Sequence, residues 1–167
     1  MPRKSRIFWP VAFCLLFADC ATKRIAVERL GATPEVPHDV IGSALRFTLA
    51  YNQGTAFGFL PGPVARAGVI LFTGVAIAVL LRLYRRASAG DGALALALAL
   101  TTGGALGNLA DRLMSPRGVV DFIDAGAGPV RFWIFNVADV GVTCGAALLV
   151  YLFWRRADAV RAEPSSR

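Results

Sequence analysis

Two aspartates, Asp121 and Asp139, are the residues of this sequence whose types best suit a hydrolytic reaction. Two carboxyl groups held close together cannot both ionise easily, so such a pair shares one proton. The ionised member can then accept a proton from a water molecule while the protonated member polarises a carbonyl group. If the segment around Asp121 folds over the helix that carries Asp139, the pair could hydrolyse a peptide bond without a metal or a covalent intermediate.

Other polar residues stand inside long apolar runs, where ionisable side chains are costly and indicate a function by default. Asp19 and Lys23 are four residues apart, which places them on one face of a helix. Asn136 and Asp139 are three apart, and we expect Asp139 to lie seven residues, about 10 Å, along its helix. A third group closes another apolar run and consists of Gly104, Asn108, Asp111 and Arg112.

Most of these residues also have a purely structural interpretation. Asp19 and Lys23 could be an ion pair that neutralises itself at the membrane interface. Asn108 could join two helices by hydrogen bonds, and Gly103-x-x-x-Gly107 could let two helices pack closely. Interfacial anchoring would account for Asp111 and Arg112. A lone deep carboxylate such as Asp139 is harder to explain in this way, because burial drives it towards its neutral form.

Residues for other catalytic chemistries are few. The single histidine, His38, lies in a turn-rich segment, and we expect it on the surface. One histidine cannot complete a zinc site, and no Ser/His or Cys/His set occurs in the apolar runs. Three cysteines without metal-ligand spacing (Cys14, Cys20 and Cys144) are expected to be small packing residues inside helices. We therefore expect no metal and no cofactor.

Four apolar runs must position the polar residues. Only 17% of the 167 residues are charged, whereas a soluble domain carries about a quarter. The runs cover about 7–27, 64–83, 93–113 and 132–154, and crossing a bilayer takes ~20 residues. The sequence therefore predicts a mainly α integral membrane protein, a single domain over residues 1–167, with four transmembrane helices.

Basic residues predict the orientation of these helices. The N-terminus, the loop at 82–92 and the C-terminal tail together hold ten basic and three acidic residues, which is the whole net charge of +7. Both termini should thus be cytoplasmic, in a bacterial cytoplasmic (inner) membrane. The polar residues of the spans then converge near the outer leaflet. Topology and attraction to anionic membrane lipid explain the basic charge, so we expect no nucleic-acid partner.

The N-terminal segment resembles a secretory leader with a lipidation cysteine, Cys20. We reject this interpretation because Asp19 directly precedes that cysteine, where a small residue is expected. The helical pattern also continues beyond it, through Ile25 and Val27.

Two longer connections should lie on the outer side, at about 28–63 and 114–131. In the first, Val40-Ile41 and Leu45–Tyr51 are predicted as short strands joined by a turn at Gly42-Ser43. The second is rich in glycine and proline. We expect a small β-sheet on the outer (periplasmic) face of the membrane.

Five motifs in order along the chain resemble those of the lipoprotein signal peptidases (signal peptidase II). They cover nearly the whole sequence, and two departures, Thr55 where alanine is more usual and Val140 where serine is common, leave the aspartates untouched. The motifs are Asp19-x-x-Thr22-Lys23, Asn52-Gln53-Gly54-Thr55-Ala56-Phe57-Gly58, residues 103–112 (GGALGNLADR), Gly118-Val119-Val120-Asp121-Phe122-Ile123, and Phe135-Asn136-Val137-Ala138-Asp139.

This resemblance implies an aspartyl intramembrane peptidase with Asp121 and Asp139 as the catalytic pair. Its substrates would be diacylglyceryl-modified prolipoproteins, cut just before the lipidated cysteine, and we expect the enzyme to act as a monomer. The fold implied is four spanning helices with a small outer sheet. Substrate-binding or supporting roles are implied for Asp19, Lys23, Asn52, Gly54, Gly104, Asn108, Arg112 and Asn136.

Three other functions fit the sequence less well. A proton-coupled or cation transporter would need polar groups across the full membrane thickness and often an inverted repeat, and the sequence has neither. A scaffold subunit would need none of the buried polar residues. An intramembrane aspartyl protease of the Gly-x-Gly-Asp type would need a motif that is absent here.

Overall fold

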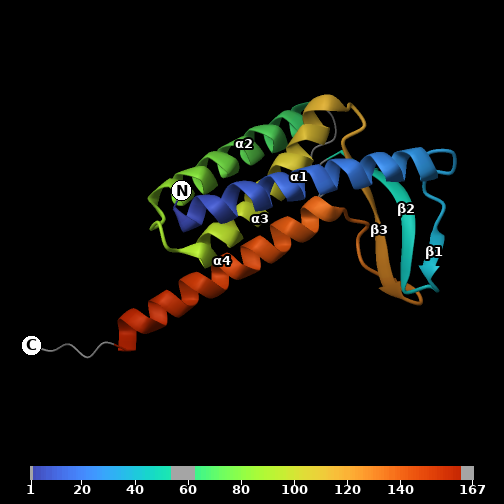
Figure 1. Cartoon of the computed structure of the whole chain (residues 1–167). Coiled ribbons are helices and arrows are strands. Elements are labelled where there is room, and N and C mark those ends of the chain that lie inside the picture. The colour runs from blue at the N-terminus through green and yellow to red at the C-terminus, as the bar shows by residue number, and fades with distance from the viewer. Residues whose placement is uncertain (1, 54–62, 163–167) are drawn as a thin grey trace, which may run out of the picture.

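The computed structural model describes residues 2–53 and 63–162 and shows an elongated helical bundle with a small sheet at one end (Figure 1). The start of α1, the end of α4 and the connection between α2 and α3 lie at the end opposite the sheet. The sequence-based prediction of a mainly helical protein with a small sheet is thereby confirmed. The helices are α1 (Arg3–Leu30), α2 (Pro63–Arg86), α3 (Gly92–Met114) and α4 (Val137–Ala162).

Helix α3 is the centre of the bundle and packs against all three other helices. Most of its buried residues are alanine or glycine, which let neighbouring backbones approach closely. A Cβ atom at Gly104 would collide with the carbonyl oxygen of Ala138 on α4. A Cβ atom at Gly107 would collide with the carboxylate of Asp19 on α1. These two glycines therefore set the spacing of α1, α3 and α4.

Three of the helices are long and apolar enough to cross a membrane, over Val64–Arg86, Gly92–Met114 and Val137–Asp158. Helix α1 is longer still, with 28 residues, but polar side chains interrupt it. The cysteines of α1 and α4 were expected to be packing residues, and this expectation is wrong. Cys14, Cys20 and Cys144 are all exposed on helix surfaces.

Residues of α1 and α2 pack together at the end of the bundle away from the sheet. The ring of Phe8 stacks on that of Tyr84, with centroids 4.0 Å apart. Lys4 donates hydrogen bonds to the carbonyl oxygens of Tyr84, Arg85 and Ala87, at 3.2, 3.2 and 2.6 Å. A lysine at these carbonyls is favourable because the C-terminus of a helix carries partial negative charge.

The sheet has four antiparallel strands in the order β1-β2-β3-β4. Strands β1 (His38–Ile41) and β2 (Leu45–Asn52) occupy the two predicted segments. Gly42 between them has φ 47°, a conformation that favours glycine. The expected position of His38 on the surface is also confirmed. Strands β3 (Val119–Ala127) and β4 (Val130–Arg131), however, come from the connection that was predicted as a loop.

Helix α4 begins at Val137 and not near Phe132 as the apolar pattern predicts. The backbone of Phe135 instead pairs with that of Ile123, so the chain before the helix is extended. The side chain of Asn136 accepts a hydrogen bond from the backbone N–H of Asp139 at 2.9 Å, as an N-cap residue does. The prediction that Asp139 lies seven residues into its helix is therefore wrong, because this residue is in the first turn.

Candidate active site

The two aspartates meet where the sheet joins the helices. Asp121 is in β3 and is buried, and Asp139 is in the first turn of α4. Asn136 contacts both: its side-chain amide donates to Asp121 Oδ1 at 2.6 Å, and its backbone N–H donates to Asp139 Oδ2 at 3.1 Å. The carboxyl groups are near enough for the charge of Asp139 to act on Asp121. The structure thus brings together the pair that the sequence singles out.

Reciprocal hydrogen bonds between Asn136 and Asp139 fix the orientation of one carboxylate. Each residue accepts the backbone N–H of the other through its side chain, which is the arrangement of a helix capping box. The second oxygen of Asp139 accepts a hydrogen bond from Asn108 Nδ2 at 2.8 Å. Both oxygens of Asp139 are therefore hydrogen-bonded, and one of the two donors is a side chain of α3.

Asn108 links the aspartate pair to a buried lysine. Its side-chain oxygen accepts hydrogen bonds from Asn136 Nδ2 at 3.1 Å and from Lys23 Nζ at 3.0 Å. Since an amide oxygen can only accept, these two donors determine that the Asn108 nitrogen faces Asp139. Asn108 is therefore more than a connector of helices, as it orders the groups around the carboxylates.

Lys23 forms ion pairs with two carboxylates from different helices. Its Nζ is 2.7 Å from Asp19 Oδ2 and 2.9 Å from Asp111 Oδ2. Asp19 also accepts the backbone N–H of Ala138 at 2.9 Å and is fully buried, as is nearly all of Lys23. The i,i+4 ion pair considered from the sequence is present, but it is not at an interface with solvent. It joins α1 to α3 and to the start of α4.

Asp111 was not among the predicted site residues, although it lies inside one of the motifs. Besides the ion pair with Lys23, its Oδ2 accepts the backbone N–H of Val120 at 3.1 Å. Because Val120 directly precedes Asp121, this bond fixes the backbone of β3 beside the candidate catalytic carboxylate.

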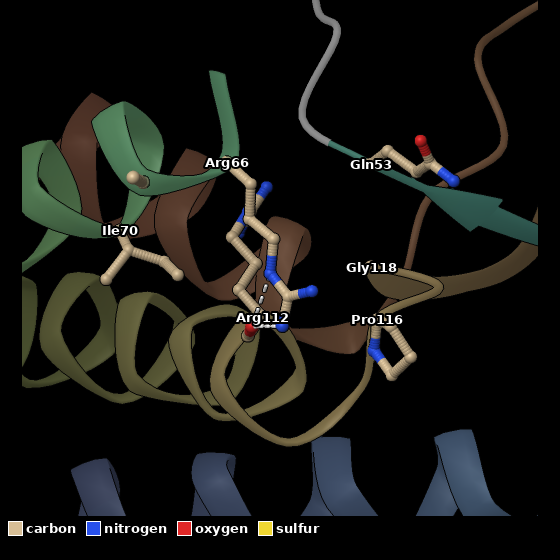
Figure 2. Close-up of a pocket in the computed structure, with 7 residues that line it drawn as sticks. Gln53, Arg66, Ile70, Arg112, Pro116 and Gly118 are labelled. Atoms are coloured by element: carbon tan, nitrogen blue, oxygen red, sulfur yellow. Dashed lines mark hydrogen bonds between the residues drawn. The ribbon is translucent and has the colours of Figure 1, made fainter. Parts of the chain in front are cut away.

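Arg112 lies on the other side of the aspartates. Its guanidinium interacts electrostatically with Asp139 and Asp121, and its Nη1 donates to the carbonyl oxygen of Asn108 at 3.1 Å. Arg112 also lines a cavity of about 410 Å³, together with Gln53, Arg66 and Gly118 (Figure 2). One positively charged residue thus both lines the cavity and acts on the two carboxylates.

The remaining predicted residues fall into three cases. Asn52 ends β2, where it pairs with Val119, and its side chain hydrogen-bonds Asp121. Gly104 is in the contact of α3 with α4 and has a packing role. Gly54 lies outside the described residues, as does the motif after it up to Gly58.

Burial perturbs the ionisation of the pair. Removal of Asp121 from water is the largest effect and the charge of Asp139 the next, and together they raise the pKa of Asp121 to about 6. Hydrogen bonds from Asn136 and Asn52 and the charge of Lys23 act in the opposite direction. The arrangement therefore favours one shared proton on two carboxyl groups. Among the described residues, no three His, Cys, Asp or Glu side chains are grouped as metal ligands.

Comparisons with known proteins identify relatives over almost the whole chain. The family model of signal peptidase (SPase) II matches residues 11–155. A lipoprotein signal peptidase of Streptomyces coelicolor is 38% identical over 164 residues, which cover 93% of this chain and 74% of that protein. One of Halothermothrix orenii is 36% identical over 147 residues, with 87% and 94% covered.

Two solved structures also match this chain in fold. A bacterial membrane enzyme determined at 1.9 Å matches with a TM-score of 0.77 and 29% identity, over 86% of this chain and 89% of the other. A second, at 2.3 Å, matches with a TM-score of 0.78 and 27% identity, over 94% and 92%.

Proposed function

This chain belongs to the signal peptidase II family, and from that premise we propose that it is a membrane aspartyl endopeptidase that removes the signal peptide from diacylglyceryl-modified prolipoproteins. The bond cut would be the one just before the lipidated cysteine. Family membership establishes a peptidase that acts in lipoprotein processing. The aspartyl mechanism is supported by one observation above all, the meeting of Asp121 and Asp139 on Asn136.

The proposed mechanism uses one proton shared by the two carboxyl groups. Burial favours that proton on Asp121, and the ionised Asp139 accepts a proton from water as the water oxygen attacks the carbonyl carbon of the scissile bond. Asp121 donates its proton to the carbonyl oxygen. The tetrahedral intermediate breaks down when Asp139 passes its proton to the amide nitrogen and Asp121 regains one from a hydroxyl group. The products are the carboxyl end of the signal peptide and the free amino group of the cysteine.

The other polar residues would act by holding this pair in place. Asn52, Asn108 and Asn136 orient the carboxylates through hydrogen bonds. The ion pairs of Lys23 with Asp19 and Asp111 fix α1, α3 and β3 around them. Arg112 would stabilise the negative charge of the ionised pair. Gly54, from the family motif, is proposed as a substrate-binding residue on the resemblance alone.

The placement of the pair suits the proposed substrate. The three apolar helices and α1 would give four spans within a single membrane domain, with the sheet on the periplasmic face and both termini in the cytoplasm. The aspartates lie at the sheet end of the bundle. In the proposed orientation this end would be near the outer leaflet, the depth at which a diacylglyceryl group would hold the scissile bond. We propose that the enzyme acts as a monomer, surrounded by lipid of the bacterial inner membrane, and uses no cofactor.

Hydrolysis of a diacylglyceryl-prolipoprotein in detergent or liposomes tests this function. We expect the wild type to cleave before the lipidated cysteine in the presence of a chelator. Asp121→Asn and Asp139→Asn should each be folded and at least about a thousandfold slower, because a lone carboxyl group cannot be acid and base together. Asp39→Asn is the matched control, since Asp39 is an exposed aspartate of β1 outside the site.

Two results would contradict the proposal. An inert wild type, with substrate of proven lipidation, would exclude the peptidase activity. Near-full activity in either aspartate variant would exclude the two-aspartate mechanism and leave the family membership standing.

A further inference from the structure

We propose that Arg66 is a positioning residue of this peptidase: it fastens α2 to the last turn of α3 and so holds Arg112 beside the two aspartates. The inference rests on the proposed function, because it assigns Arg66 a part in the same reaction. Arg66 belongs to none of the five sequence motifs. It stands in the first turn of an apolar helix, where a charged side chain is costly without a partner.

The contact between Arg66 and α3 is specific. Arg66 donates hydrogen bonds through both Nε and Nη2 to the main-chain carbonyl oxygen of Arg112, the first at 3.0 Å. That carbonyl is among the last four of α3, which have no partner within the helix. Figure 2 shows the two arginine side chains next to each other and the bonds converging on this oxygen. Arg66 thus completes the C-terminal end of α3 from a neighbouring helix.

Arg112 needs such support because little else holds it. On one side its guanidinium borders the cavity of about 410 Å³, so packing cannot fix it there. Its Nη1 bonds to its own helix, at Asn108, and its Nε is buried with no hydrogen-bond partner among the described residues. Within that same part of the chain, it forms no direct ion pair with a carboxylate. The position of Arg112 therefore follows the position of the helix end.

Helix α2 depends on Arg66 in turn. At the other end of the bundle, Lys4 and Phe8 bind it to α1. Near the sheet, Arg66 joins the first half of α2 to α3. Among the described residues, its hydrogen bonds are the only ones between this half of the helix and another element. Loss of Arg66 would release α2 and the last turn of α3 together, beside the candidate active site.

The charge balance of the aspartate pair links this contact to catalysis. Arg112 is the cation that acts on both Asp121 and Asp139, so its displacement would make the ionised pair less stable and move the acidic limb of the rate profile to higher pH. Other groups that face Asp121 stay in place and set the remaining field. They are Lys23 from α1, Asn52 from β2, and Asn136 and Asp139 at the start of α4. Asp111 from α3 acts on Asp121 through its ion pair with Lys23.

Three variants test the inference in purified, detergent-solubilised protein. Arg66→Met removes the bonds, Arg66→Lys keeps the charge and one donor group, and Arg24→Met removes an exposed arginine of α1 as a matched control. We expect Arg66→Met to lower kcat about tenfold to a hundredfold with less effect on KM, because a small misplacement of catalytic groups has effects of this size. The acidic limb of the pH–rate profile of Arg66→Met should move to higher pH. Arg66→Lys should recover part of both losses, and Arg24→Met should match the wild type.

Hydrogen exchange of the backbone amides provides a second readout that does not depend on activity. In Arg66→Met, amides of the last turn of α3 and of the first turns of α2 should exchange faster, while those at the opposite ends of both helices are unchanged. Wild-type kcat, pH profile and exchange in a folded Arg66→Met would overturn the inference. So would a rise in KM alone, which would make Arg66 a substrate-binding residue. An inert wild type refutes the proposed function separately, and exchange then still decides whether Arg66 fastens the helices.

Discussion

Asn136 shows how one residue can organise a two-carboxylate site. Its backbone N–H and its side-chain oxygen fix Asp139, while its side-chain nitrogen reaches Asp121 and Asn108. Because the residue is fully buried, none of these groups can exchange its partner for water. An aspartate in its place would match the shape but would add a third negative charge beside the pair.

The raised pKa of Asp121 predicts how the stability of the fold depends on pH. The carboxyl group titrates near pH 6 in the folded protein and near its ordinary value of 3.8 in the unfolded chain. Between these values the folded state binds more protons, so stability is lost as the pH rises through the window and the loss is complete above it. A shift of this size corresponds to about 3 kcal/mol at neutral pH.

Asp121→Asn isolates that contribution. The amide does not titrate, so the free energy of unfolding of the variant, relative to the wild type, should increase by up to about 3 kcal/mol between pH 4 and pH 7. Thermal or denaturant unfolding in detergent at several pH values measures it, with Asp39→Asn as a control whose difference stays flat. A difference between Asp121→Asn and the wild type that does not change with pH would contradict the raised pKa.

At the scale of elements, the contacts of α3 are the most sensitive part of the bundle. Gly107→Ala would place a methyl group against the carboxylate of Asp19 and near Ala138, so α1 or α4 must move. We expect a destabilisation of about 1–3 kcal/mol, typical of overpacking, measured by thermal unfolding in detergent.

Gly74→Ala is the matched control within the same type of structure. Among the described residues, no atom lies within 4 Å of a Cβ built at Gly74 of α2, and alanine forms helices better than glycine. This variant should be as stable as the wild type or more so. Equal losses in Gly107→Ala and Gly74→Ala would contradict the assignment of the loss to close packing at Gly107.

The sequence predicts the helices and two strands well because their apolar patterns are local. It does not predict β3, whose residues are buried on both faces for most of its length and therefore lack the alternation of a half-buried strand. In the sequence, the glycines and proline around β3 favour a loop. Only the tertiary fold, which pairs Tyr51 with Val120, makes this segment a strand.

The predicted start of α4 is wrong for a different reason. Residues 132–135 are as apolar as the helix that follows, so hydropathy alone extends the span through them. The capping residues Asn136 and Asp139 were visible in the sequence and mark the true beginning of the helix. For the site, spacing could identify the aspartates, but the bond from Arg66 to a main-chain carbonyl leaves no trace in the sequence.

At the scale of the whole molecule, the sheet lies at one end of the bundle, and the start of α1 and the end of α4 lie at the other (Figure 1). The excess of basic residues is at the end away from the sheet, which predicts the cytoplasm there. This topology can be measured with single cysteines in a background where Cys14, Cys20 and Cys144 are replaced by alanine. Asp39→Cys in β1 and Ser88→Cys between α2 and α3 are both exposed positions.

A membrane-impermeant thiol reagent should label Asp39→Cys in spheroplasts whose inner membrane is intact. It should label Ser88→Cys only after that membrane is permeabilised. Labelling of both positions from outside would mean that the two ends of the bundle are on one side, and the reverse pattern would invert the proposed orientation. The reverse pattern would remove the aspartates from the outer leaflet, whereas labelling of both positions would contradict the four-span topology.

The ion pair of Asp19 and Lys23 also bears on how the chain is made. Asp19 emerges early from the ribosome, but its partner Ala138 is 119 residues further along. At ordinary rates of translation this delay is about 6 to 24 s. During that time the carboxylate of Asp19 is without its partner on α4, whereas Lys23, one turn away in the same helix, is already there. In the proposed four-span topology, the local pair would offset the charge of this carboxylate until the last helix arrives and completes the site.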